Sequence, residues 1–163
     1  MKMRSLKAAA GVAVAAAATA VTLASPASAT SASSDWRLAG GDTFQLNGWH
    51  CGTYVTACSW TASTKLLGYN PANARWIENK TELEAHGISA SLTISKNPEA
   101  TLTMVSSSLG VVRWRNYNAW ISDNSGVMRP GWTTVYVSVR SCGSASVNAN
   151  ITVSQKCVYA GAA

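Results

Sequence analysis

The sequence predicts an all-β protein: a single antiparallel β-sandwich or barrel that is stapled by two disulfides and follows a cleaved signal peptide. Three observations support this fold class. Several stretches alternate apolar and hydroxyl-bearing residues with a period of two, short turn signals separate them, and no long helical pattern is present. Four cysteines follow an export signal, which is typical of disulfide-bonded secreted domains.

The first 29 residues have the three parts of a secretory signal peptide. A basic start is followed by an apolar run over 8–23 and by an A-x-A site that ends at Ala29. The run is too rich in alanine and glycine for a membrane anchor, and its style is typical of high-GC bacteria. We therefore expect cleavage before Thr30, secretion of a single β domain over 30–163, and fraying at its new end over 30–35.

Removal of the signal halves the net charge. The chain carries 13 Lys and Arg against 7 Asp and Glu, a formal net charge of +6; three basic residues lie in the signal, which leaves +3. No block of Lys or Arg remains, so we expect no nucleic-acid partner. No second apolar segment is long enough to span a bilayer, so we expect no membrane span in the mature chain.

Strand candidates cover most of the mature chain. The clearest is 88–95, where apolar residues at even positions alternate with Ser and Thr, which predicts one buried and one exposed face. Residues 81–87 could instead form a single helical turn. The other predicted strands, in chain order, are 42–47, 53–60, 74–80, 100–104, 110–117, 133–140 and 146–154. Predicted turns, rich in Gly, Pro, Asn, Asp and Ser, are 68–73, 95–100, 122–126 and 129–131.

Cys51, Cys58, Cys142 and Cys157 predict two disulfides, since their spacings do not match short zinc knuckles. Two connectivities stay open. If the first pair lay on one continuous strand, its cysteines would be about 23 Å apart and could not bond to each other. Reading 146–154 as one strand likewise favours bonds between the two pairs. Sequential pairing is the simpler alternative, and a hairpin near Asn150 would permit it.

Signatures of enzymatic chemistry are missing. The mature chain has two histidines, His50 and His86, and lacks G-x-S-x-G and S-x-x-K motifs. We expect no cofactor. One local group could hold a divalent cation, because Glu82, Glu84 and His86 would project from one face of an extended strand. Lys80 shares that face and would weaken such a site, so we predict no metal site.

Tryptophan is frequent, with seven residues against a single phenylalanine. Buried indoles fill a sandwich core, whereas exposed indoles stack on sugars or anchor protein interfaces. A strand over 113–120 would place two arginines and a tyrosine on one face and two tryptophans on the other. The predicted candidate binding surface consists of Arg113, Trp114, Arg115, Tyr117 and Trp120.

These observations favour a small secreted binding protein whose partner is an extracellular protein or a cell-wall polysaccharide. Two alternatives come from other classes. One is a protease inhibitor or antibacterial toxin that presents a disulfide-held loop at 52–57 or 143–150. The other is an extracellular hydrolase that uses dispersed carboxylates. The sequence does not specify an oligomeric state.

Overall fold

The computed structural model describes residues 30–51, 57–68, 73–86, 90–97, 99–106, 109–130 and 136–161. The predicted signal peptide at 1–29 lies outside the described residues.

The described residues form ten strands. In chain order they are β1 (Ser31–Arg37), β2 (Thr43–His50), β3 (Cys58–Leu67), β4 (Ala74–His86), β5 (Ala90–Ile94), β6 (Thr101–Met104), β7 (Leu109–Ala119), β8 (Ile121–Pro130), β9 (Tyr136–Ser146) and β10 (Thr152–Ala160).

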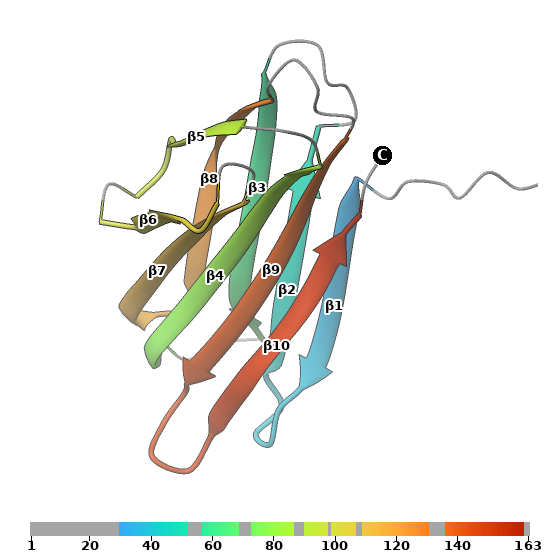
Figure 1. The fold of residues 1–163 in the computed structure, drawn as a ribbon. Coiled ribbons are helices and arrows are strands. Elements are labelled where there is room, and N and C mark those ends of the chain that lie inside the picture. The colour runs from blue at the N-terminus through green and yellow to red at the C-terminus, as the bar shows by residue number, and fades with distance from the viewer. Residues whose placement is uncertain are drawn as a thin grey trace, which may run out of the picture.

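The strands form two sheets that lie face to face (Figure 1). Sheet I has the order β1-β2-β3-β8-β5, and sheet II has the order β10-β9-β4-β7-β6. All neighbouring strands run antiparallel. This confirms the predicted fold class, an all-β antiparallel sandwich with two disulfides. Across the described ranges, no helix is long and apolar enough to cross a bilayer.

Side chains of one parity along each strand fill the space between the sheets. In β4, Ile77 and Leu83 are fully buried, whereas the glutamates of the opposite parity lie on the outer face. The buried apolar side chains form two clusters. The first contains Phe44, Leu46, Leu66, Ala74, Ile77, Ala145, Val147, Val153 and Val158. The second contains Cys58, Trp60, Leu83, Ala85, Val112, Met128, Val137, Val139 and Ala160.

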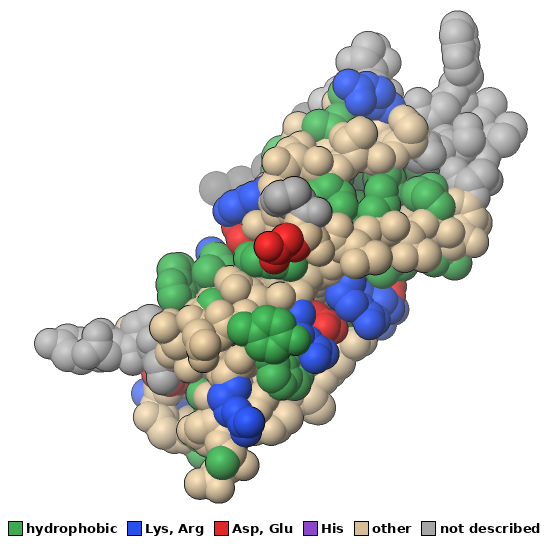
Figure 2. Space-filling view, turned by 90° about the vertical axis from the view of Figure 1, so that its left-hand side faces the viewer, with side chains coloured by type: hydrophobic (Ala, Val, Ile, Leu, Met, Phe, Trp, Pro, Cys, Tyr) green, Lys and Arg blue, Asp and Glu red, His purple; other side chains and the backbone are tan. Residues whose placement is uncertain are grey.

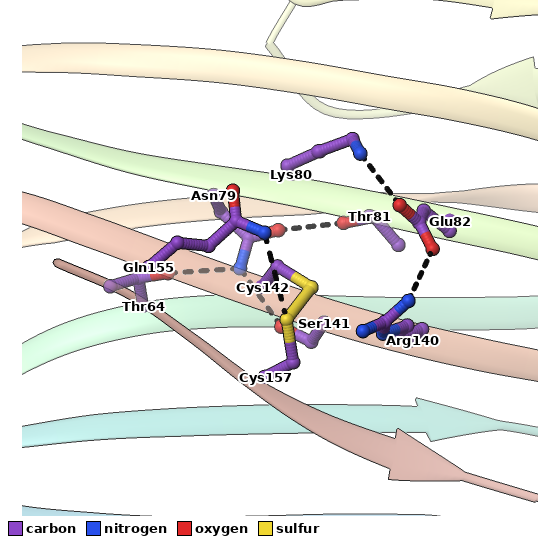
Figure 3. Close-up of a disulfide and its surroundings, with 10 residues drawn as sticks. All are labelled: Thr64, Asn79, Lys80, Thr81, Glu82, Arg140, Ser141, Cys142, Gln155 and Cys157. Atoms are coloured by element: carbon purple, nitrogen blue, oxygen red, sulfur yellow. Dashed lines mark hydrogen bonds and ion pairs between the residues drawn. A yellow bond between two sulfur atoms is a disulfide. The ribbon is translucent and has the colours of Figure 1, made fainter.

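A buried polar layer lies between the two apolar clusters. Its centre is Asn79, whose Nδ2 donates to Thr64 Oγ1 at 3.0 Å and to Ser141 Oγ at 2.9 Å (Figure 3). The Oδ1 atom of Asn79 accepts from Thr81 Oγ1 at 2.6 Å and from Asn124 Nδ2 at 3.2 Å. These bonds connect both sheets, because Thr64 and Asn124 belong to sheet I and the others to sheet II. No local sequence pattern indicates this layer, because its members come from four different strands.

The predicted turn at 122–126 is wrong, because these residues form the first half of β8. Ser122 and Asn124 are buried and contribute to the polar layer. Ser122 Oγ accepts from the backbone N–H of Asn79 at 3.2 Å and donates to the carbonyl of Trp114 at 2.8 Å. Partners on other strands therefore replace the local hydrogen bonds that make Ser, Asp and Asn favour turns.

Two further expectations are corrected by strand pairing. Fraying was expected over 30–35, but residues 31–35 belong to β1 and pair with β2, to which β1 is joined by a turn where Gly40 and Gly41 have φ angles of 109° and 98°. Residues 81–86 do not form a helical turn, because β4 continues to His86 and pairs with β7 and β9. The predicted strands at 88–95 and 133–140 correspond to β5 and the start of β9, although 88–89 and 133–135 lie outside the described residues.

The disulfides join Cys51 to Cys58 and Cys142 to Cys157, so the sequential connectivity is correct. Cys51 follows β2 and Cys58 begins β3, so the first pair is not on one strand, and its Cα atoms are 5.3 Å apart. Residues 52–56, part of the predicted strand 53–60, lie outside the described residues. The second bond links directly opposed residues of β9 and β10.

A tight turn explains the second pairing, because it interrupts the strand predicted over 146–154. Asn148 Oδ1 accepts from the backbone N–H groups of Asn150 at 2.8 Å and Ile151 at 2.9 Å. An asparagine side chain that bonds the backbone two residues on is a common turn former. The hairpin that it closes brings Cys142 opposite Cys157.

His50 is fully buried and has two backbone partners. Its Nδ1 lies 2.7 Å from the carbonyl oxygen of Cys51, and its Nε2 lies 2.7 Å from that of Gly161. The ring thus connects the end of β2 with the residue that follows β10. Both ring nitrogens are thus engaged by backbone carbonyl groups, which gives this histidine a structural role.

Candidate binding face

The outer face of sheet II collects most of the charged and aromatic side chains that the sequence singled out. Five rows of side chains cross this face. Each row contains one even-numbered residue of β4 between 76 and 84, together with the residues opposite it on the neighbouring strands. The row at Glu82, for example, runs from Tyr159 through Arg140 and Glu82 to Val111 and Thr103. This outer face of sheet II is the candidate binding face.

One end of the face holds a cluster of arginine and aromatic groups. The Arg115 guanidinium lies 4.3 Å from the centre of the Trp76 ring, and it also pairs with Glu78 Oε2 at 3.0 Å. Tyr117 lies directly opposite Trp76 in the register and is 63% exposed. The ion pair and the cation–π contact hold Arg115 in one position.

The centre of the face holds a second group of charges. Glu82 lies between Lys80 Nζ at 2.6 Å and Arg140 Nη1 at 3.4 Å (Figure 3). Partial burial raises the pKa of the Glu82 carboxyl, but the hydrogen bond and charge of Lys80 and the charge of Arg140 outweigh it. The pKa of Glu82 therefore lies below its ordinary value of 4.5. The Cys142–Cys157 disulfide lies beside this group and joins β9 to the edge strand β10.

The three residues weighed as a cation site share this face, as expected for an extended strand. Glu82 is engaged by Lys80 and Arg140, and Glu84 Oε2 lies 3.5 Å from His86 Nε2. Among the described residues, no group of three or more His, Cys, Asp or Glu side chains is arranged to hold a metal ion.

Two shallow pockets lie side by side on the candidate binding face. The central pocket, of about 320 Å³, is lined by Glu82, Glu84, Leu109, Ser138, Arg140 and Tyr159. The edge pocket, of about 480 Å³, is lined by Thr101, Thr103, Val105, Val111 and Arg113. Leu109 and Val111 are successive outer residues of β7, so the pockets are neighbours. Figure 2, viewed from the side of β5, β6 and β7, shows hydrophobic side chains next to Lys and Arg groups.

The five residues predicted as a binding surface do not all lie on one face of the structure. Arg113, Arg115 and Tyr117 alternate on the outer side of β7 and are exposed, as the period-two pattern predicts. Trp114 has the opposite parity and is half-buried. Trp120 lies between β7 and β8 and is 41% exposed. The prediction missed Trp76, Tyr159, Arg140 and the glutamates that pair with the arginines, because these lie on strands distant in sequence.

The outer face of sheet I carries the exposed indole of Trp49 beside polar side chains. Trp49 is 41% exposed and is flanked in register by Ser31 and Thr61. In the next row, Asn47 Oδ1 accepts from Ser33 at 2.9 Å, and Asn47 Nδ2 donates to Ser63 at 3.3 Å. This face can offer hydrogen bonds beside one aromatic surface. Of the other tryptophans, only Trp60 is fully buried in the described part of the chain, and Trp132 lies outside it.

The alternative functions have few structural features in their favour. Glu78 and Glu82 of the candidate binding face are ion-paired, Glu84 Oε2 lies 3.5 Å from His86 Nε2, and Asp123 on the other face pairs with Lys96. Of the two loops considered for an inhibitor, 52–56 lies outside the described residues. The other, 143–150, consists of the end of β9 and the tight turn before β10.

Comparisons with known proteins leave the family open. No protein-family model and no curated protein matches the chain significantly. Among solved structures, a collagen-binding domain from a Staphylococcus aureus adhesin is similar with a TM-score of 0.38 and 10% sequence identity. The likeness covers 64% of this chain and 85% of that domain. A likeness at this level carries no argument about what this chain binds.

Proposed function

We propose that this chain is a secreted binding module of residues 30–163 that contacts another extracellular protein through the candidate binding face. One observation carries the proposal. Arg115 is fixed on the Trp76 ring next to the exposed Tyr117, and these three residue types dominate the energetics of protein interfaces. A group that is held in place before binding loses less conformational entropy when a partner arrives.

A protein partner is favoured over a sugar on this face. Sugar recognition uses the open surface of aromatic rings, and Arg115 already covers the Trp76 ring. The edge pocket is lined by threonine, valine and arginine side chains, and the central pocket is lined by charged side chains together with Leu109, Ser138 and Tyr159. The two disulfides and the predicted signal peptide support an oxidising, extracellular location.

The test is a pull-down from secreted proteins with the immobilised mature domain, followed by affinity measurement for any captured protein. Tyr117→Ala should weaken binding by about tenfold, as expected for an exposed aromatic near an interface centre. Trp49→Ala is the matched control, because it removes an equally prominent ring from the opposite face. If Tyr117→Ala and Trp49→Ala bind the captured protein equally well, the proposal fails.

A second candidate function rests on the outer face of sheet I. Trp49, with the hydrogen-bonded Ser33, Asn47 and Ser63 beside it, suits a cell-wall polysaccharide, because sugars combine apolar ring faces with hydroxyl groups. Affinity electrophoresis in gels that contain cell-wall polysaccharide checks this function. Retardation that disappears in Trp49→Ala and persists in Tyr117→Ala would support it.

A further inference from the structure

The edge pocket differs from the rest of the candidate binding face in its charge balance. Among the described residues that line it, Arg113 alone is charged. Its Nε lies 3.8 Å from Glu78 Oε1, beyond hydrogen-bond distance, while Glu78 makes its close contacts with Arg115 at 3.0 Å. Among the described residues, Arg113 has no other ion pair, and its side chain is 56% exposed. The guanidinium therefore has donors free for a ligand.

The neighbouring charges do not neutralise this guanidinium. In the register, Arg113 lies between Thr101 of β6 and Lys80 of β4. Lys80 is bound to Glu82, which also binds Arg140. The nearest carboxylates are thus already shared between cations, and a positive charge is left at the pocket.

The remaining lining of the edge pocket is divided between hydroxyl and aliphatic groups. Thr101 and Thr103 contribute hydroxyl-bearing side chains from β6, and Val105 and Val111 contribute apolar surface. Val105 is 60% exposed and the adjacent Met104 is 45% exposed. These are two of the few large apolar side chains exposed in the described structure, and they lie at the same edge. Exposed apolar groups next to an exposed and loosely paired cation favour a ligand that carries both chemistries.

We infer that the edge pocket binds an acidic segment of a partner protein in which a carboxylate side chain is close to an aliphatic one. The carboxylate pairs with Arg113 and accepts hydrogen bonds from the threonine hydroxyls, because guanidinium and carboxylate groups match as planar, bidentate partners. The aliphatic side chain covers Val105 and Val111. The described residues of the pocket lining offer no aromatic ring for stacking on a sugar, so a protein segment is favoured over an acidic polysaccharide. This inference rests on the proposed function and specifies the partner.

The test uses a short synthetic peptide that alternates Glu and Leu, added to the isotope-labelled mature domain and followed by NMR. Saturable shift changes are expected at the amides of β6 and β7. Arg113→Gln should weaken binding by about tenfold, which corresponds to the loss of a charge-assisted hydrogen bond. Raising the salt concentration from about 0.01 M to about 0.15 M should weaken it further, because the Debye length falls from about 30 Å to about 8 Å.

Controls separate this site from general attraction between opposite charges. Arg37→Glu changes an exposed arginine on sheet I, reverses its charge and should leave peptide affinity unchanged. A peptide that alternates Lys and Leu should not bind. Thr103→Val keeps the shape of the pocket, removes one hydroxyl and should weaken binding by a smaller factor than Arg113→Gln.

Three outcomes would overturn the inference: no saturable shifts at β6 and β7, equal affinity of Arg113→Gln and the unchanged chain, or binding of oligogalacturonate in place of the peptide. Failure of the edge-pocket inference is distinguishable from failure of the proposed function. A captured protein that depends on Tyr117 and not on Arg113 would leave the binding module intact and remove the edge pocket from it.

Discussion

Asn79 shows how a polar side chain is accommodated in the centre of this sandwich. It is fully buried, and both side-chain polar atoms are hydrogen-bonded to residues of β3, β4, β8 and β9. Gly143 makes room for this arrangement, because a Cβ there would lie 2.4 Å from Thr64 Oγ1 and 2.4 Å from Leu46 Cδ2. A satisfied buried network rigidifies a core, whereas a partly satisfied one is costly. The hydrogen bonds of Asn79 therefore link the two sheets, while Asn124 Oδ1 in the same layer has no hydrogen-bond partner among the described residues.

Replacement of Asn79 by alanine should lower the free energy of unfolding by about 3 kcal/mol, because it leaves the hydroxyls of Thr64 and Ser141 and the amide of Asn124 short of partners. Urea unfolding followed by circular dichroism measures the change. Asn150→Ala is the matched control, since this exposed side chain is outside the layer, and its effect should stay within about 0.5 kcal/mol. Equal effects of the two substitutions would show that the layer adds no stability.

Glu82 makes a pH-dependent contribution to stability. Its pKa is lower in the folded chain than its ordinary value of 4.5, so the ionised form stabilises the fold. This contribution is complete above the ordinary value and is lost as the pH falls through the lowered pKa. Glu82→Gln should therefore cost up to about 1 kcal/mol at pH 7, and the difference from the unchanged chain should vanish in acid.

Unfolding curves recorded between neutral and acidic pH measure this difference. Glu99→Gln serves as the control, because Glu99 is exposed and has no ion pair within the described residues. A difference between Glu82→Gln and the unchanged chain that stays constant over the whole pH range would refute the assignment.

At the scale of elements, both disulfides close connections between strands that are adjacent along the chain. The Cys51–Cys58 bond closes the connection between β2 and β3, and the Cys142–Cys157 bond joins β9 to the edge strand β10. β10 also has a register shift between Val153 and Lys156. An irregular edge strand has fewer ladder partners, and the disulfide ties β10 to β9 within sheet II.

Loss of the second disulfide should destabilise the chain more than loss of the first. The cysteines are 15 residues apart in the Cys142–Cys157 pair and 7 apart in the Cys51–Cys58 pair. Loop-closure entropy then gives losses of about 3 kcal/mol and about 2 kcal/mol. Urea unfolding of the two double Cys→Ser variants measures the order, which a smaller loss for the second pair would contradict.

At the scale of the whole molecule, the two outer faces of the sandwich present different groups: sheet II carries the linked Arg, Lys and Glu side chains, and sheet I carries Trp49 beside hydrogen-bonded hydroxyl and amide groups. Strand β7 ends sheet II at Ala119, and the chain enters sheet I at Ile121. Asn118, with a φ of 49°, lies at this crossing, and the backbone N–H of Leu66 bonds the Trp120 carbonyl at 2.7 Å. One stretch of sequence therefore contributes to both sheets and presents Arg115 and Tyr117 on the outer side of sheet II.

Local sequence patterns were sufficient for much of the fold and part of the site. The alternation at 110–117 predicted a strand and the face that Arg113, Arg115 and Tyr117 share, because side-chain direction in a strand depends only on parity. Local patterns gave wrong predictions at 122–126 and 146–154. Ser and Asn residues lie in a buried strand in the first segment, and Asn148 forms a turn in the second. Hydrogen-bond partners on distant strands decide whether such a segment becomes a buried strand or a turn. The alternation of side chains along the segment contains no information about those partners.

The amino-acid sequence by itself determined an all-β domain with two disulfides, because period-two alternation, turn residues and cysteine number are local properties. Only the tertiary structure decided the sulfur connectivity, the burial of Asn79 and Asn124, and the pairing of Glu78 with Arg115. Each of these depends on which strands become neighbours. Strand neighbours are selected by the packing of the whole sandwich, in which a buried polar group is tolerated only where other strands supply its hydrogen bonds.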